Sequence, residues 1–293
     1  MKLATFVYQG SRRVGLLSDD GLRVQTLDLS TQENERGILS LVDRKASGKP
    51  FPAVNSESIA LSDVKLEAPI PRPMRNIFCV GRNYHAHAKE LSTTVFKDNN
   101  VDPNAWPIVF TKVPECVTGP YDDVYLPLNV SQQIDYEAEL AVIIGKECKN
   151  LTEDNALDAI AGYSCFNDGS VREFQRHTIQ WTMGKNFDKT GPFGPIMVTP
   201  DELPEAATGL KIECRLNGQT VQSSTTDMMI FPVIETLVYI TKAFTLEPGD
   251  LVIMGTPSGV GHARKPPLWM KDGDLVEIEI EGIGILANPI KAE

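Results

Sequence analysis

The chain has 293 residues, enough for one large domain or for a large domain with a small one. A formal net charge of −11 at pH 7 gives a surface that repels phosphate backbones, so we expect no nucleic-acid partner. No apolar run reaches the length of a membrane-spanning helix, and the first residues lack the apolar core of a signal peptide, so we expect a cytoplasmic protein with no membrane partner. The five cysteines are scattered along the chain, so we expect them to be reduced thiols.

Residues 1–67 are predicted to form a small N-terminal α/β domain. Two β-rich runs are broken by turn signals at Gly10 and at Asp20-Gly21, and a short helix is expected to end at Gly48. Three prolines then follow between 69 and 73, and proline cannot continue a helix or a central strand because it has no backbone N–H. We therefore place a proline-rich linker at 68–75 and a metal-binding catalytic domain at 76–293.

Short β-rich runs dominate the larger part of the chain, with a hairpin expected to turn at Asn217-Gly218. Helices are fewer. One is predicted within 151–162, with Thr152 as its N-cap and Gly162 as its stop. Another follows Pro232, with an apolar stripe at Ile234, Leu237, Val238 and Thr241. The strands do not alternate regularly with helices, so a doubly wound sheet is disfavoured.

The stretch GRNYHAHAKEL, residues 81–91, holds two of the four histidines. These side chains are compatible with metal ligation, with a catalytic dyad or with a polar helix end. Residues three apart on a helical turn face the same side, so Glu90 can hold the His87 imidazole in one tautomer, as a general base requires. An isolated H-x-x-E pattern also arises by chance, and the stretch alone leaves the three interpretations open.

An acidic pattern at 135–139 is more informative. Side chains alternate across a strand, so Asp135, Glu137 and Glu139 are predicted to share one face, about 6.6 Å apart along the strand. Two such carboxylates can converge on one ion, although a solvated acidic edge strand would show the same pattern. Asp168, at the end of the next strand, adds a third oxygen donor or only caps the following helix. Three oxygen donors suit a hard cation, so Mg²⁺ or Mn²⁺ is predicted, and Ca²⁺ also fits.

Two further stretches carry suitable polar groups. Lys185 lies in a loop rich in glycine and proline, where a solvated lysine is the ordinary interpretation. Thr256 lies in the glycine-rich loop MGTPSGVG after an apolar strand. That loop is not a Walker loop, because no Gly-Lys-Ser/Thr follows, but its N–H groups and its hydroxyl can bind a carboxylate or an oxyanion.

In this order, the stretches GRNYHAHAKE, DYEAE, FNDGSVREFQ, GKNFDKTGPFGP and MGTPSGVG resemble the fumarylacetoacetate hydrolase family. The resemblance runs from about residue 70 to the C-terminus, and the N-terminal unit looks like that of longer bacterial members. It implies an α+β, mostly β fold, a mixed β-sandwich roll with few helices. It also implies a homodimer that acts on a small 2-oxo acid.

The resemblance further assigns roles to individual residues. It implies metal ligation by Glu137, Glu139 and Asp168. It also implies a catalytic group of His87, Glu90 and Lys185, while His85 receives no role. Substrate contacts are expected from Arg82, Tyr84, Gln175 and Thr256. Arg172 matches a position behind the acids, and a purely structural ion pair is an equal alternative. The usual N-D-x-S-A-R-D reads NDGSVREFQ here, a change that is conservative for metal binding.

The activity expected from this resemblance is metal-dependent hydrolysis of a C–C bond in 2,4-dioxo acids, such as the acylpyruvates of aromatic catabolism. In this hypothesis His87, assisted by Glu90, deprotonates a water that attacks the distal carbonyl, and Lys185 stabilises the pyruvate enolate. Oxaloacetate decarboxylation is the alternative, followed by isomerisation or hydration of a hydroxymuconate-type diacid. A non-enzymatic binder is disfavoured, because it has no need of the dyad. A polar segment at 91–106 is predicted to act as a lid.

Overall fold

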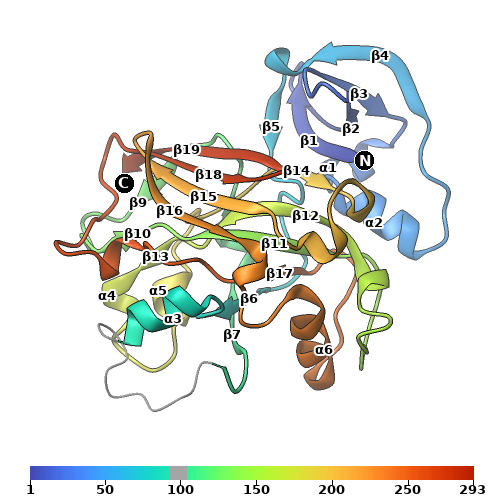
Figure 1. Cartoon of the computed structure of the whole chain (residues 1–293). Coiled ribbons are helices and arrows are strands. Elements are labelled where there is room, and N and C mark those ends of the chain that lie inside the picture. The colour runs from blue at the N-terminus through green and yellow to red at the C-terminus, as the bar shows by residue number, and fades with distance from the viewer. Residues whose placement is uncertain (93–103) are drawn as a thin grey trace.

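Two β-sheets lie face to face over the central part of the molecule (Figure 1). The computed structural model describes residues 1–92 and 104–293. The large sheet has the strand order β4-β3-β2-β1-β14-β12-β11-β17-β6-β7, with β5 beside β1 and β8 beside β14. The second sheet has the order β16-β15-β18-β19-β9, and β10 pairs with β13 separately.

The strands of the large sheet, in chain order, are β1 (Lys2–Tyr8), β2 (Ser11–Leu17), β3 (Arg23–Leu27), β4 (Val54–Ala60), β5 (Lys65–Glu67), β6 (Ile77–Gly81), β7 (Ile108–Lys112), β8 (Val117–Thr118), β11 (Ala138–Ile144), β12 (Ile160–Asn167), β14 (Gly191–Val198) and β17 (Leu251–Ile253). The remaining strands are β9 (Val124–Leu126), β10 (Ile134–Asp135), β13 (Ser170–Val171), β15 (Lys211–Leu216), β16 (Gln219–Thr225), β18 (Leu275–Ile280) and β19 (Gly284–Ala292).

The α-helices are short and lie around the sheets: α1 (Thr31–Glu35), α2 (Leu39–Ala46), α3 (His85–Ser92), α4 (Arg172–Gln175), α5 (Thr182–Lys185) and α6 (Val233–Ala243). Single turns of 3-10 helix connect other elements: η1 (Leu61–Asp63), η2 (Pro114–Cys116), η3 (Leu157–Ala159), η4 (Pro200–Glu202), η5 (Glu205–Ala207), η6 (Thr226–Met228) and η7 (Gly261–Ala263). In Figure 1, α3, α4 and α5 gather near the β10–β13 pair, away from the N-terminal strands.

Strand β11 is the centre of the core because it is apolar on both faces. Leu140 and Val142 pack into the hydrophobic cluster that includes Ile212 and Ile278 of the second sheet. The alternate residues, such as Ile143, pack into a second cluster with Leu39 and other residues of α2. This alternation follows from the strand's two-residue period. It holds β11, and the acids at its N-terminal end, in a rigid position.

The predicted fold class is confirmed as α+β and mostly β. The large sheet is mixed, since β17 pairs in parallel with β6 while most other neighbours are antiparallel, so it is not doubly wound. Strand β1 pairs with β14, and the large sheet therefore continues from residues 1–67 into the rest of the chain. Residues 68–75 carry no helix or strand. The proposed domain boundary stays a prediction.

Of the local structures predicted from turn and capping residues, one hairpin is confirmed and one helix is wrong. The hairpin turn is confirmed, because Asn217 and Gly218 both have positive φ between β15 and β16. The predicted helix at 151–162 is wrong: only the single turn η3 forms, and β12 begins at Ile160. Gly162 lies inside that strand, where an added Cβ would stand 2.7 Å from the Val198 carbonyl oxygen. The glycine permits close strand packing and does not stop a helix.

Helix α6 forms where it was expected, but its buried face is shifted. Leu237 and Thr241 are buried as predicted, whereas Ile234 and Val238 are only partly buried. All five cysteines are free and buried, which confirms that they form no disulfide. Among the described residues, none of the helices has the length and apolar character needed to cross a bilayer.

Candidate active site

Three buried carboxylates meet at the N-terminal end of β11. Glu137 immediately precedes β11, Glu139 lies within it, and Asp168 follows β12. Each offers a carboxylate oxygen, and these oxygens lie within 4.8 Å of one another. The predicted continuous acidic strand is interrupted, because β10 ends at Asp135 and β11 begins at Ala138. Glu137 and Glu139 nevertheless converge, while Asp135 turns to other partners.

An arginine joins Asp135 to this acid cluster. Arg172 of α4 donates from Nε to Asp135 Oδ2 at 2.9 Å, from Nη2 to Glu137 Oε1 at 2.5 Å, and from Nη1 to Gln175 Oε1 at 2.9 Å. Gly261 and His262 donate their backbone N–H groups to the same Asp135 carboxylate. The arginine therefore makes structural ion pairs that also fix the orientation of Glu137.

Two buried lysines complete the charge arrangement. Lys185, at the end of α5, lies 2.5 Å from both Glu137 Oε2 and Asp168 Oδ2. It is 2% exposed, so the solvated-loop interpretation is wrong. Lys112, at the end of β7, lies 2.9 Å from Asp168 Oδ1 and donates to the carbonyl of Gly169 at 3.2 Å.

The charges of this cluster leave a deficit of positive charge. With every group ionised, four carboxylates (Asp135, Glu137, Glu139 and Asp168) face three cations (Lys112, Arg172 and Lys185), which gives the cluster one formal net negative charge. Burial and the charges of Asp168 and Glu137 raise the pKa of Glu139 well above its usual range. Burial also acts on Glu137, but Arg172 and Lys185 outweigh it and lower that pKa. An all-oxygen cluster with this deficit fits a hard divalent cation.

The glycine-rich loop after β17 closes over the acids. Gly255 donates its N–H to Glu139 Oε2 at 2.6 Å. Its φ of +90° and its close approach require glycine, because an added Cβ would stand 2.7 Å from the Cβ of Asn83. The Asn83 side chain donates to the carbonyls of Phe231 and Met254 and so ties the start of α3 to this loop.

The histidine stretch forms α3, and its two histidines differ in environment. His87 is 3% exposed, and its Nδ1 lies 3.2 Å from Glu90 Oε2, whereas His85 is exposed. The N–H of Gly259 donates to both oxygens of Glu90, at 3.1 and 3.3 Å. The predicted base-and-orienter geometry is therefore present.

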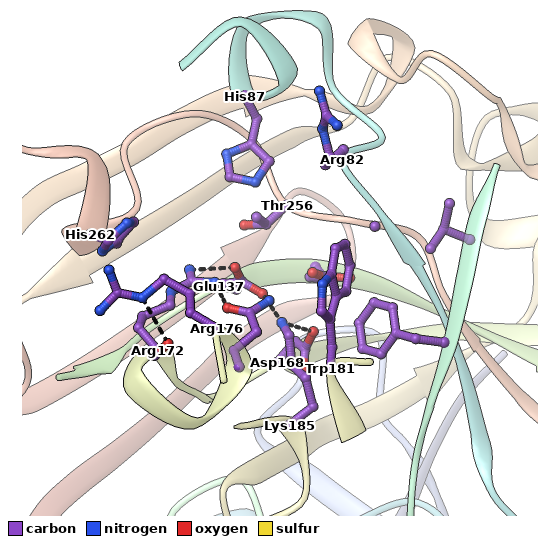
Figure 2. Close-up of a pocket in the computed structure, with 15 residues that line it drawn as sticks. Arg82, His87, Glu137, Asp168, Arg172, Arg176, Trp181, Lys185, Thr256 and His262 are labelled. Atoms are coloured by element: carbon purple, nitrogen blue, oxygen red, sulfur yellow. Dashed lines mark hydrogen bonds and ion pairs between the residues drawn. The ribbon is translucent and has the colours of Figure 1, made fainter. Parts of the chain in front are cut away.

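One cavity connects these groups. Figure 2 shows His87 and Arg82 on one side, Glu137, Asp168 and Lys185 on the other, and Thr256 between them. The lining of the cavity includes most residues predicted to bind substrate: Arg82, Gln175 and Thr256. Tyr84 is different, because it lies in the hydrophobic core at 1% exposure and does not line the cavity. The predicted substrate contact of Tyr84 stays a prediction.

Comparison with known proteins identifies the family. A family profile described as "Fumarylacetoacetate (FAA) hydrolase C-terminal" matches residues 76–291. The chain belongs to the fumarylacetoacetate hydrolase family. The resemblance inferred from the five sequence stretches is thus confirmed.

Individual relatives cover most of the chain. "Oxaloacetate tautomerase YisK" of Bacillus subtilis is 38% identical, with coverage of 99% of this chain and 100% of that protein. "Oxaloacetate tautomerase FAHD2A, mitochondrial" of Homo sapiens is 40% identical, with coverage of 89% and 79%. A solved structure, "Fumarylacetoacetate hydrolase (EaFAH) from psychrophilic Exiguobacterium antarcticum", has a TM-score of 0.85 and 37% identity, with full coverage of both chains.

Sequence reasoning missed several residues of this site. Arg176, Trp181 and His262 line the cavity, and Lys112 supports Asp168 from behind. The FTKVP stretch and the GHARK stretch contain two of them, but neither has a spacing that indicates a site before the chain is folded. The predicted lid at 91–106 falls largely on residues 93–103, which lie outside the described part of the structure.

Proposed function

We propose that this protein interconverts the keto and enol forms of a small 2-oxo diacid, with oxaloacetate as the first substrate to test. The observation that carries the proposal is the His87–Glu90 pair, which faces the buried carboxylates across one cavity. A group that moves protons and a site that suits a cation are what enolisation of a 2-oxo acid requires. The similarity to two proteins that are named oxaloacetate tautomerases supports the same reaction.

We propose Glu137, Glu139 and Asp168 as the ligands of a Mg²⁺ or Mn²⁺ ion. When bound, such an ion supplies Lewis-acid polarisation of the 2-oxo acid. It would also convert the net negative charge of the paired cluster into a net positive one, which favours an anionic substrate. This proposal corresponds to the metal site expected from the sequence.

The protein's own residues perform the proton transfer in this proposal. With Nδ1 engaged by Glu90, the Nε2 atom of His87 is the nitrogen available to remove a proton from the carbon next to the ketone. The electrons of that C–H bond form the C=C bond, and those of the C=O π bond move to oxygen. Lys185 and Thr256 stabilise the negative oxygen, which then receives a proton to give the enol. The reverse sequence returns the ketone.

Acylpyruvate hydrolysis remains a second candidate. Phe110 and Trp181 line the cavity, and their apolar rings offer a surface for the acyl group of such a substrate. The solved structure from Exiguobacterium antarcticum carries a hydrolase name. His87 would then activate a water rather than remove a carbon-bound proton. Both reactions use the same enolate-stabilising groups.

One set of assays separates these reactions. Metal-loaded protein is mixed with enol-oxaloacetate, and loss of the enol absorbance is compared with the uncatalysed rate. Parallel samples measure CO₂ release from oxaloacetate and cleavage of acetylpyruvate and fumarylpyruvate. Catalysed enol loss without CO₂ release supports the tautomerase proposal. An unchanged enol decay with rapid acylpyruvate cleavage would replace it with hydrolysis. The homodimeric state and the cytoplasmic location remain predictions.

A further inference from the structure

The buried side chain of Gln222, in β16, joins two parts of the site. Its Oε1 accepts the backbone N–H of Ala138 at 3.0 Å, between the acids Glu137 and Glu139. Its Nε2 donates to Thr256 Oγ1 and to the Pro257 carbonyl, both at 2.8 Å. The side chain is 1% exposed, so these three bonds are made without competition from bulk water.

These partners determine which end of the amide is nitrogen. A carbonyl oxygen such as that of Pro257 only accepts, and the Ala138 N–H only donates. The opposite orientation would place the amide oxygen against the Pro257 carbonyl and the amide NH₂ against the Ala138 N–H. Both contacts would then be repulsive, so the amide orientation follows from hydrogen bonding alone.

The amide orientation in turn determines the role of the Thr256 hydroxyl. Because the hydroxyl accepts a hydrogen from Gln222, its own proton is directed to another partner. Within the described residues, no protein acceptor is recorded for that proton. Thr256 lines the cavity, between His87 and the acids (Figure 2). The hydroxyl proton is therefore available to an oxygen atom inside the cavity.

We propose that Gln222 is a positioning residue that orients the Thr256 hydroxyl so that it donates a hydrogen bond to a negatively charged oxygen of the substrate. This inference deepens the proposed function, on which it rests, because that oxygen would belong to the 2-oxo acid or to its enolate. It also predicts that the site favours a substrate with an acceptor oxygen at this position.

Oxalate, an unreactive mimic of the pyruvate enolate, provides the test. We would measure the Kd of oxalate by calorimetry on Mn²⁺-loaded protein, and the Kd of Mn²⁺ separately, for Thr256→Val, Gln222→Met and the double variant. Loss of a hydrogen bond to a charged oxygen predicts about 10- to 100-fold weaker oxalate binding for Thr256→Val. Gln222→Met should weaken oxalate by about 2- to 10-fold. The double variant should bind oxalate like Thr256→Val alone, because Gln222 acts through that hydroxyl.

One further variant controls for folding. Asn288→Leu removes another buried amide, which donates to the carbonyls of Gly119 and Asp122 away from the cavity. It should lower thermal stability and leave the oxalate Kd unchanged.

The outcomes are distinct. Multiplicative losses in the double variant, or an equal loss of Mn²⁺ and oxalate affinity in Gln222→Met, would each overturn the inference. A wild-type protein that binds Mn²⁺ but no oxalate would overturn both this inference and the proposed function. Normal oxalate binding without turnover of oxaloacetate would overturn the proposed function alone.

Discussion

The most discriminating prediction concerns the two histidines of α3. We would replace His87, His85 and Glu90 singly by glutamine in metal-loaded protein. His87 lines the cavity at 3% exposure, whereas His85 is exposed and is not part of the cavity lining. The two residues are two positions apart on a helix, about 200° around its axis, so they cannot share one role.

The structure allows the size of each effect to be estimated. Removal of a general base costs about 10²- to 10⁴-fold in turnover, equivalent to about 3–5.5 kcal/mol at 1.36 kcal/mol per decade. In Glu90→Gln the amide oxygen still accepts the Gly259 N–H and the His87 ring N–H, so only the charged character of the bond is lost. That difference is about 1–1.5 kcal/mol, or about 5- to 10-fold. His85→Gln should change turnover less than 2-fold.

The assay is enol-oxaloacetate decay at saturating metal, with the metal Kd measured for each variant. The expected order of loss is His87 first, then Glu90, then His85, with metal affinity nearly constant throughout. Equal losses from His85→Gln and His87→Gln would refute the assignment of the base. A large loss of metal affinity in His87→Gln would show instead that this histidine is a ligand.

Three other predictions follow from the charge cluster. Chelation of the metal should abolish turnover, and added Mg²⁺ or Mn²⁺ should restore it. Glu139→Ala, which deletes one of three proposed ligands, should weaken metal binding in a direct titration. Full activity after chelation would contradict the metal site. Arg172→Met should lower the free energy of unfolding in urea by about 3–5 kcal/mol, or about 5–8 °C in Tm, because it leaves the buried Asp135 carboxylate without a cation and removes one of the two cations of Glu137. The half-exposed ion pair between Arg36 and Asp43 is the matched control, and Arg36→Met should lower the free energy of unfolding by less than about 1 kcal/mol. Similar losses of stability in the Arg172 and Arg36 variants would refute the argument from burial. Burial, with the charges of Arg172 and Arg176, lowers the pKa of His262 to about 4. Because the unfolded chain then takes up this proton at a higher pH than the folded protein, the free energy of unfolding should fall as the pH drops from about 6.5 toward about 4. His262→Phe should flatten that part of a pH–stability curve.

Many residues of the site were predictable because they belong to short motifs that follow one another in a fixed order along the chain. The E-x-E pattern, the NDG turn and the H-x-x-E pattern each place functional side chains by local geometry alone. The structure brings Glu137, Glu139, Asp168, His87 and Lys185 around one cavity, as their combination in the sequence indicates. The predicted functional roles of these residues await the experiments above.

Local signals failed where tertiary contacts outweigh them. The helix predicted at 151–162 has a capping residue and a glycine stop, yet Ile160 and Gly162 enter β12 because β11 and β14 offer a complete set of strand partners. Tyr84 belongs to the histidine motif, but its ring is in the core, where Met229 pairs with its backbone. A motif position therefore does not by itself state which way a side chain points.

The sequence by itself determined the family, the mostly β fold class, the reduced cysteines and the set of oxygen donors, since these depend on residue identity and on short spacings. Only the tertiary structure decided the support of the site. Lys112 reaches Asp168 across 56 positions, and Gln222 reaches Thr256 across 34. Such contacts arise when sheets close on one another, and the buried, low-dielectric setting they create makes a paired charge or an oriented hydroxyl effective. No local pattern can encode that environment, because it exists only after distant strands have met.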